Sequence, residues 1–384
     1  MGDTYHLTLS PYEKWWIQYQ PFLLTRGYQL RPRYQRDWVP SWTLPDSGFD
    51  PERENYHEFE DGIREMRKNV LDAVRLSDRN KVVLRRVITA SPELSILEYL
   101  NTRQHPHNRT VPLLDVIPLP DDDSTLIIVI PFLQQFDVPV FRHLREVVEC
   151  MRQYFQGLQF MHFHRITHRD VCALNMMMDA TKVQPFGFHF RFSKTIDGNL
   201  EHPSGWRDRC LVAPVDYYFI DFGLSSFHEE GADQARDVAA VGQDKTVPEL
   251  SDDEPYNPFK VDIYQLGNVF LKQSRRHPTL SPYFGSLLQS MTALDPAARP
   301  SAAQLLTAFE DLCSRIPENE LDKKMPNIPQ SPYYSGESDS DYELVTDSES
   351  ESNCEPSKAS DSGPRDFVLH NPKFGLYLRL VPHT

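Results

Sequence analysis

The sequence predicts an α+β protein with two unequal lobes, because strand patterns come first and helical patterns follow. Between residues 69 and 133, short β-prone runs surround one helical stretch, whose Ser91 and Pro92 make a helix start. Beyond Leu133, apolar residues recur at spacings of three or four, the period of an amphipathic helix. They are Leu144, Val147, Val148, Met151, Phe155, Leu158 and Met161.

The strands are expected at 69–76, 81–87 and 125–130, and further helices at 261–273 and 301–314. Composition then divides the chain into four parts. They are an aromatic-rich, irregular lead segment (1–60), a small β-rich lobe (61–133), a larger helical lobe (134–317) and an acidic, Ser-rich tail (318–384). An insertion is expected at about 183–211, where phenylalanines alternate and suggest an extra strand. They are Phe186, Phe188, Phe190 and Phe192.

The tail is too polar and Pro/Ser-rich to bury the apolar surface that ordering requires, so disorder is expected from 318 to about 366. Apolar residues alternate again at 373–381, which is typical of a half-buried strand and makes this stretch a candidate to dock on the body. Acids follow several hydroxyl residues by three positions, a pattern that favours phosphorylation by acidophilic kinases. These residues are Ser338, Ser340, Thr346, Ser348 and Ser352.

Composition restricts the class of partner and the compartment. The 384 residues carry a formal charge of −15, concentrated at 331–366, and show no basic stripe, so nucleic acid is not an expected partner. The longest apolar run, at 126–130, is far shorter than a membrane span, and neither a leader nor a lipid anchor is expected. The five scattered cysteines predict neither disulfides nor a zinc site. A cytoplasmic or nuclear location is expected.

Two short motifs carry the chemistry. The run "HRDVCALN" places Asp170 five positions before Asn175, and "YYFIDFGL" places Asp221 directly after an apolar strand. Phosphoryl transfer needs a carboxylate to accept the hydroxyl's proton, and oxygen ligands for the magnesium ion that bridges the phosphates. The three side chains have the types and spacing that this chemistry requires.

Three further stretches follow in order: "VPEL" at 247–250, "KVDIYQLGNVF" at 260–270 and "LDPAARPSAAQLL" at 294–306. With the two motifs above, they resemble the eukaryotic protein kinase fold over about residues 62–315, in the divergent form of kinase-like proteins of fungi. The resemblance implies a two-lobed fold, ATP and Mg²⁺ as cofactors, and a protein as substrate or binding partner.

The resemblance also implies roles for individual residues. Asp170 would be the catalytic base, Asn175 and Asp221 the magnesium ligands, and Arg85 with Glu93 the pair on the phosphate side. Other residues would be structural or contact the adenine. Packing roles would fall to His168, Phe222 and Gly223, and Asp262 would brace the catalytic loop. Arg299 would pair with Glu249, and Arg169 would act at the activation segment. Ile130 would be the gatekeeper, with Pro131 and Leu133 at the adenine.

The sequence departs from the kinase pattern at three places. Arg85 stands where kinases have a lysine, and guanidinium is bulkier and forked; Lys81 could replace it only in a register shifted by four residues. The glycine-rich loop is missing. Cys172 and Leu174 replace the basic residue of the catalytic loop, and Cys172 is read as an apolar filler in preference to a redox switch.

The prediction is therefore a weak or atypical serine/threonine protein kinase. The main alternative is a pseudokinase scaffold or binding module. A small-molecule kinase is disfavoured by Glu249, Asp262 and Arg299, which belong to the protein-substrate apparatus. In the activation segment, Arg169 is expected to bind a phosphate or, without phosphate, a glutamate. The candidates are Ser225, Ser226 and Thr246 as phosphate acceptors, and Glu229 and Glu230 as unmodified partners.

Overall fold

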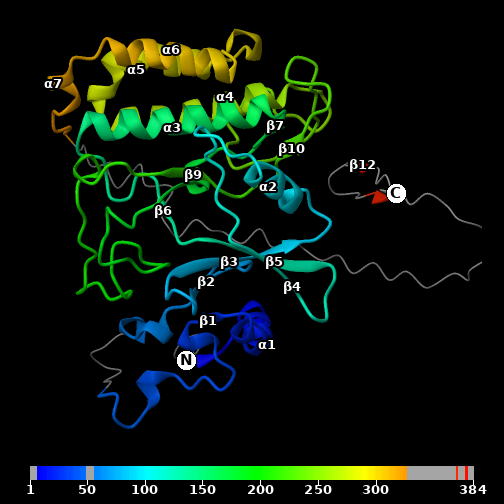
Figure 1. Ribbon diagram of the computed structural model, residues 1–384, viewed down its shortest axis with the longest axis vertical. Helices are drawn as coiled ribbons and strands as arrows, with labels where there is room; N and C mark the ends of the chain where they lie inside the picture. The colour runs from blue at the N-terminus through cyan, green and yellow to red at the C-terminus, as the bar shows by residue number, and fades with distance from the viewer. Residues whose placement is uncertain (1–6, 49–55, 327–368, 371–376, 379–384) are drawn as a thin grey trace, which may run out of the picture. The chain divides into compact units, whose positions relative to one another are not determined.

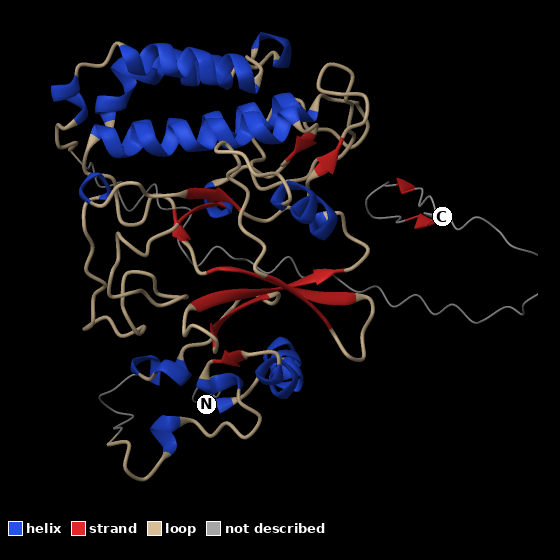
Figure 2. Cartoon of the chain, in the orientation of Figure 1, coloured by secondary structure: helices blue, strands red, loops and turns tan. Residues whose placement is uncertain are grey.

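The computed structural model describes residues 7–48 and 56–326, and two short strands at 369–370 and 377–378. The chain divides into two compact units, Met1–Ile328 and Pro329–Thr384. The first unit is a mixed α/β structure that combines an antiparallel sheet with a group of α-helices (Figures 1 and 2).

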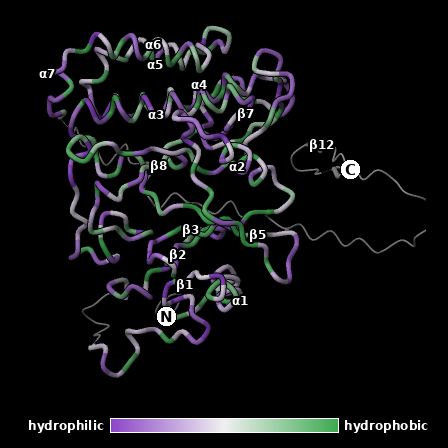
Figure 3. The backbone as a smooth tube through the Cα atoms, viewed as in Figure 1, coloured by the Kyte–Doolittle hydropathy of each residue, from purple (hydrophilic) through white to green (hydrophobic). Residues whose placement is uncertain are grey.

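The main sheet has five antiparallel strands. In spatial order they are β1 (Tyr28–Leu30), β2 (Val70–Arg75), β3 (Lys81–Ile88), β5 (Thr125–Pro131) and β4 (Asp115–Pro118). The three strands predicted from the sequence, β2, β3 and β5, are confirmed. β3 and β5 share the longest pairing, from Val82↔Pro131 to Ile88↔Thr125, and Figure 3 shows the hydrophobic run along β5. The short strands β1 and β4 were not predicted, because three or four residues give too little alternation to detect.

One face of the sheet is covered by a helix that the sequence analysis missed. Residues 1–60 were expected to be irregular, but α1 spans Pro11–Thr25 and β1 is a strand of the sheet. Ser10 and Glu13 form a capping box at the start of α1, which is a sequence signature of a helix. The aromatic residues of α1 and β1 form one apolar cluster with the sheet, so this segment is part of the core. The cluster includes Trp16, Tyr19, Leu23, Leu71, Leu84, Ile127 and Val129.

The other face of the sheet packs on α2 (Glu93–Asn101), through Ile96, Leu97 and Leu100. The predicted helix is confirmed, although it starts at Glu93. Pro92, with no side-chain cap, is the N-cap residue, and the hydroxyl of Ser91 is buried without a partner. The side chain at the first helical position, Glu93, is buried.

The remaining α-helices pack together above the sheet in Figure 1, with α3 against α6 and α4 against α5. Their bounds are α3 (Leu144–Phe163), α4 (Pro258–Arg276), α5 (Ser281–Met291), α6 (Ala302–Ser314) and α7 (Glu318–Leu321). The helices predicted at 144–161, 261–273 and 301–314 are confirmed, whereas α5 was not predicted. No helix among the described residues has both the length and the apolar character to cross a bilayer.

Short strands hold the loops that carry the two chemical motifs. One group is β6 (Gln134–Gln135), β8 (Met176–Met178) and β9 (Tyr217–Phe219); the other is β7 (Ile166–Thr167) with β10 (Ser226–Phe227). The loop after β7 runs into the 3₁₀ turn η6 (Ala173–Asn175), which leads directly into β8. The loop after β9 begins at Ile220 and ends at β10. Both loops are therefore fixed at each end by strand pairing.

The extra strand predicted in the 183–211 insertion is wrong. This stretch contains the 3₁₀ turn η7 (Arg209–Leu211) and one isolated bridge, Thr195↔Pro203, with no strand. Phe188 and Phe190, which alternation would place on one face, do share a partner, since both rings contact Phe132. The surrounding backbone forms turns instead of a ladder, because it finds no neighbouring strand to pair with.

The acidic tail begins later than the expected boundary at 318. α7 and the residues after it belong to the first unit: the Met325 N–H donates to the Arg142 carbonyl over 2.7 Å, and Met325 is buried. In the second unit, β11 (Leu369–His370) pairs with β12 (Tyr377–Leu378). β12 falls inside the predicted strand at 373–381. The rest of that strand and all five expected tail phosphorylation residues lie outside the described residues.

Candidate functional site

The loop that contains Asp170 is held from below by Asp262 of α4. The carboxylate of Asp262 accepts hydrogen bonds from the backbone N–H groups of His168 (2.9 Å) and Arg169 (2.7 Å), and its Oδ2 lies 2.9 Å from Nε2 of His162. Asp262 is fully buried. The brace expected from the sequence is present, and it fixes the backbone direction on either side of Asp170.

Gln265 supplies a second support that the sequence analysis missed. Its Oε1 accepts from the Val171 N–H over 3.0 Å, and its Nε2 donates to the Arg169 carbonyl over 3.2 Å. Gln265 is fully buried on α4, three residues after Asp262. That spacing places both side chains on one helix face, which is the signal that could have identified it.

Asp170 and Asn175 are in direct contact, and a third residue joins them. Nδ2 of Asn175 donates to Asp170 Oδ2 over 2.9 Å. The Gln243 N–H donates to Asp170 Oδ1 over 2.7 Å, and Gln243 Nε2 lies 3.4 Å from Oδ2. Both oxygens of Asp170 are thus hydrogen-bonded within the chain. No sequence motif marked Gln243; its role depends on a contact 73 residues apart in the chain.

The two motif loops lie side by side. His168 Nε2 donates to the Ile220 carbonyl over 2.9 Å, and the Ile220 N–H donates to the Asn175 carbonyl over 3.0 Å. The buried ring of Phe222 lies 5.1 Å from the His168 ring. Arg169 and Asp221 have φ values of 66° and 63°, in a region that costs side chains of this size about 1–3 kcal/mol. The surrounding contacts hold both residues in this conformation.

Arg85 connects the sheet, α2 and the second loop. Its Nε donates to Glu93 Oε1 over 2.9 Å and its Nη2 to Asp221 Oδ1 over 2.5 Å. Burial acts to lower the pKa of Arg85, but the charges of Asp221 and Glu93 outweigh it and raise the pKa, so the guanidinium is charged. Lys81 is elsewhere, with its Nζ 3.2 Å from the Phe188 carbonyl. Of the two candidates for the expected lysine position, Arg85 is therefore the residue whose side chain reaches the site.

Gly223 follows in the same loop and lies close to this charged group. A Cβ built on it would lie 3.3 Å from Asp221 Oδ1 and 3.5 Å from Glu93 Oε2. Its N–H lies 3.4 Å from Asp221 Oδ1. A side chain at this position would thus crowd the carboxylates, which explains why glycine fits here.

The three residues expected at the adenine lie at the end of β5 and just after it. Ile130 is buried opposite Val83, whereas Pro131 and Leu133 are half-buried. Between them, Phe132 stacks on Phe188 of the insertion, with ring centroids 4.7 Å apart. The insertion therefore lies against this segment.

The expected activation segment begins at Asp221 and closes at 247–250. Arg169 binds this segment through an aspartate that was not predicted. Its Nη2 lies 2.9 Å from Asp237 Oδ2, and its Nη1 donates to Ser226 Oγ over 3.2 Å. The pairing expected with Glu229 or Glu230 is wrong, because the segment turns so that Asp237 reaches the guanidinium instead. Of the other expected phosphate acceptors, Ser225 is buried and donates to the His168 carbonyl, and Thr246 donates to Asp244.

The ion pair expected between Glu249 and Arg299 is present and bidentate. Arg299 Nη1 and Nη2 donate to the two Glu249 oxygens over 2.5 and 2.8 Å. The Arg299 side chain is fully buried and its guanidinium lies 4.6 Å from the Tyr264 ring centroid. Such a pair anchors the end of the activation segment to the helical part.

Cys172 and Leu174 occupy the places expected for a basic residue. Burial, with the nearby Asp170 charge, raises the pKa of the Cys172 thiol to about 12, so it is protonated at neutral pH. This agrees with the filler interpretation and leaves no reactive thiolate. Leu174 is partly exposed.

No glycine-rich hairpin joins β1 to β2. Residues 31–69 connect them, through the 3₁₀ turns η2 (Pro32–Tyr34), η3 (Ser41–Thr43), η4 (Tyr56–Glu58) and η5 (Glu60–Gly62). Gly62 has a packing role, since a Cβ built there would lie 1.9 Å from the Tyr56 carbonyl oxygen.

Comparison with known proteins gives distant matches. No family model matches the chain. It is 23% identical over 195 residues to a probable casein kinase II subunit alpha homolog of Encephalitozoon cuniculi (strain GB-M1), covering 50% of each protein. It is 23% identical over 250 residues to a probable serine/threonine-protein kinase of Dictyostelium discoideum, covering 61% of this chain and 45% of that protein. The chain thus spans about half the length of these curated relatives, and it has a distant similarity to protein kinases.

Proposed function

We propose that this chain is a two-lobed protein kinase that transfers the γ-phosphate of ATP to serine or threonine hydroxyls of proteins at a low rate. The observation that carries the proposal is the link from Arg85 to both Glu93 and Asp221, because it brings together three residues from separate elements in the arrangement that phosphoryl transfer uses. The distant similarity to protein kinases supports the same conclusion.

The residues of the site fit a magnesium ion. Asn175 uses its Nδ2 for Asp170, while its amide oxygen and Asp221 Oδ2 accept no hydrogen bond from any described residue. Both are hard oxygen donors of the kind that Mg²⁺ binds. When bound, Mg²⁺ would offset the charge of the ATP phosphates. Asn175 and Asp221 would hold it, and Arg85 would contribute positive charge on the sheet side.

Asp170 is the proposed base, and Gln243 limits its use. To accept the proton of a substrate hydroxyl, Asp170 uses a carboxylate lone pair. Gln243 donates to both of its oxygens, from the backbone over 2.7 Å and from the side chain at 3.4 Å. Gln243 therefore competes with a substrate hydroxyl for Asp170, and this competition is one reason for a low rate.

The activation segment is proposed to be ordered without phosphorylation. Arg169 is the expected phosphate-binding cation, and Asp237 already neutralises it at 2.9 Å. A carboxylate in this place supplies charge without modification. The adenine is proposed to bind the backbone of Pro131 and Leu133 beside Ile130, where Phe188 narrows the available space by stacking on Phe132.

A second candidate function is a pseudokinase scaffold that binds partner proteins without catalysis. The Arg85–Asp221 contact favours it, because an arginine of the chain already neutralises part of the carboxylate charge that would attract a metal ion. The connection at 31–69 favours it too, since it replaces the backbone amides that cover phosphates in kinases.

Phosphate transfer from labelled Mg-ATP to the chain itself and to a mixed peptide pool tests the two functions. Under the kinase proposal, label appears on serine or threonine and falls at least about 100-fold in Asp170→Asn. Asp179→Asn is a matched control, since Asp179 lies outside the site in the turn after β8. No transfer by the wild type, at any Mg-ATP concentration that gives measurable binding, would establish the scaffold instead.

Partners and location complete the proposal. The charge distribution supports a protein as the substrate or partner, with neither nucleic acid nor a membrane as a partner. The proposed location is the cytoplasm or the nucleus. The acidic tail is proposed to be a substrate of acidophilic kinases. Mass spectrometry of the chain isolated from cells tests the tail, and an unphosphorylated tail would contradict the proposal. Imaging of a tagged form tests the location, and secretion of the protein would contradict it.

A further inference from the structure

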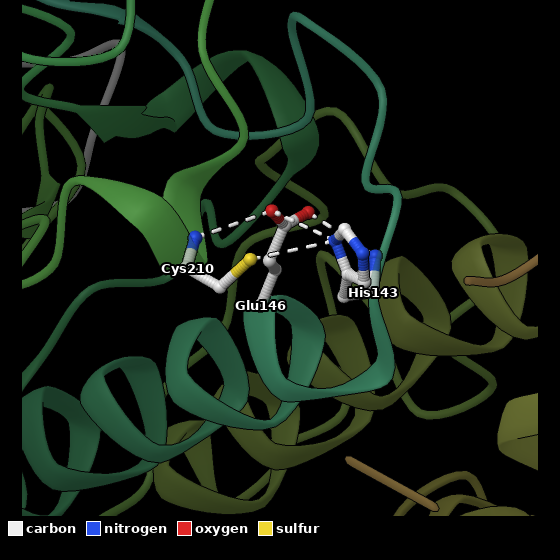
Figure 4. Close-up of side chains that lie close together, drawn as sticks. All are labelled: His143, Glu146 and Cys210. Atoms are coloured by element: carbon white, nitrogen blue, oxygen red, sulfur yellow. Dashed lines mark hydrogen bonds and ion pairs between the residues drawn. The ribbon is translucent and has the colours of Figure 1, made fainter. Parts of the chain in front are cut away.

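Three side chains of different chemistry meet where α3 begins (Figure 4). His143 is the N-cap residue, Glu146 lies in the first turn and Cys210 comes from η7 at the end of the insertion. His143 Nδ1 lies 3.4 Å from Cys210 Sγ and 3.6 Å from Glu146 Oε1. The three ligand atoms all lie within 4.8 Å of one another. This group is separate from the phosphotransfer residues.

The two separations from His143 Nδ1 match the edges of a coordination tetrahedron. Zinc bonds of about 2.0–2.3 Å to N, O and S place neighbouring ligand atoms roughly 3.3–3.8 Å apart. Both distances from His143 Nδ1 fall in this range. A fourth oxygen is also near, since Asp208 Oδ2 lies 3.8 Å from the same nitrogen. A small rotation of Asp208, or a water molecule, would complete four ligands.

The charge of Glu146 is the second observation. The side chain is 1% exposed, and no Arg or Lys among the described residues pairs with it. Oε2 accepts from the Arg142 and His143 N–H groups, which completes the helix cap, whereas Oε1 has a long 3.3 Å contact from the Cys210 N–H and lies 3.6 Å from His143 Nδ1. A buried carboxylate of this kind is stabilised by a cation, and Oε1 is the oxygen available to bind it.

We propose that His143, Glu146 and Cys210 bind a divalent transition-metal ion, with zinc the best match to one nitrogen, one oxygen and one sulfur donor. The ion would tie η7, and with it the end of the 183–211 insertion, to the start of α3. The cysteine spacing predicted no zinc site, because the ligands are 64 residues apart in the chain. Only the fold brings them together.

Metal binding at this site is coupled to a proton. An ordinary cysteine thiol is mostly protonated at neutral pH, whereas a metal ion binds the thiolate. On binding, the S–H bond breaks, the sulfur electron pair bonds to the ion, and the proton leaves to buffer. Calorimetric titration with metal in two buffers of different ionisation enthalpy measures the number of protons released. We expect close to one proton per ion.

The test uses the full chain after treatment with a chelator. Titration with Co²⁺ should give a thiolate-to-cobalt charge-transfer absorption at one ion per chain, and Zn²⁺ should displace the cobalt. Cys210→Ser should abolish this absorption and the proton release. Cys313→Ser, a partly buried cysteine outside the group, should keep both. Circular dichroism of each metal-free variant shows whether it is folded.

A second variant covers the case in which Cys210→Ser does not fold. His143→Asn keeps a short polar residue at the N-cap and should weaken zinc binding at least about 100-fold. The proposal is overturned if the wild type binds no Co²⁺ with a thiolate band, or if Cys210→Ser binds zinc as the wild type does. The group would then be a helix cap completed by a thiol-to-imidazole hydrogen bond.

Discussion

Arg85 Nη2 and Asp221 Oδ1 are 2.5 Å apart, so a cation from the central sheet is bonded to the carboxylate expected to bind magnesium. The same guanidinium holds Glu93. Among the ion pairs of residues 7–48 and 56–326, Arg85 is therefore the one connection from β3 to both α2 and the loop after β9. Whether the site accepts Mg-ATP therefore depends on the strength of this contact.

Replacing Arg85 with lysine should strengthen nucleotide binding. An ammonium group can pair with Glu93 as a point charge but cannot also hold Asp221 with a second nitrogen, so Asp221 is freed. We expect Mg-ATP affinity to rise about tenfold, or about 1.4 kcal/mol, by calorimetry, with faster transfer to peptide. Arg86→Lys, one position along β3 and stacked over Trp15 at 4.6 Å, is the control. Equal affinities in Arg85→Lys and the wild type would contradict the expectation.

Adding a methyl group at Gly242 should disturb the contact between Gln243 and Asp170. Gly242 has φ of 88°, and a Cβ there would lie 2.7 Å from the Arg169 carbonyl oxygen. Gly231 has φ of 80° with open space around it. Gly231→Ala therefore reports the backbone strain alone, about 1 kcal/mol, and Gly242→Ala should lose about 1–2 kcal/mol more in urea unfolding. Equal losses in the two variants would show that the segment is not packed on the loop.

Loss of Glu249 should destabilise the protein strongly. Arg299 is fully buried, so Glu249→Ala leaves an unpaired charge in the interior and should cost about 3–5 kcal/mol of unfolding free energy. The exposed pair between Arg315 and Asp311 provides the comparison, with side chains 69% and 57% exposed. Asp311→Ala should change stability by less than about 1 kcal/mol. Denaturant unfolding measures both; similar losses would mean that Arg299 is solvated in solution.

His189 should make stability fall in acid. Burial lowers the pKa of His189 to about 3, whereas the unfolded chain has the ordinary value of about 6.5. Between these pKa values the unfolded state therefore binds more protons than the folded state. The free energy of unfolding that neutral His189 contributes is complete above pH 6.5 and is lost as the pH falls towards 3. Between pH 6.5 and 5 the loss is about 2 kcal/mol.

His189→Asn removes this titration while keeping an acceptor for the N–H groups of Arg191 and Phe192. Its stability should fall less than that of the wild type between pH 7.5 and 5, by about 2 kcal/mol. His202→Gln, at a side chain 57% exposed, should follow the wild-type curve. Parallel curves for His189→Asn and the wild type would exclude His189 as the titrating group.

Local sequence patterns determined much of this protein. Short β-prone runs predicted β2, β3 and β5, and the three- and four-residue spacing predicted α3, because burial of one helix face imposes that period. The pairs Arg85–Glu93 and Arg299–Glu249 were also predicted, not from a local pattern but from the resemblance of their motifs to those of protein kinases. α1 could have been found from Ser10 and Glu13, but its aromatic residues concealed the helical period.

Tertiary structure alone decided the contacts that connect unrelated parts of the chain. Asp237 at Arg169, Gln243 at Asp170, and Cys210 beside His143 leave no local signal, because each depends on where a loop of many residues returns. A period in sequence reports which face of an element is buried, whereas a loop's path is set by the sum of many weak packing contacts. The sequence thus determined which residues form the motifs. The fold decided which hydrogen-bond donors and charged side chains contact those residues.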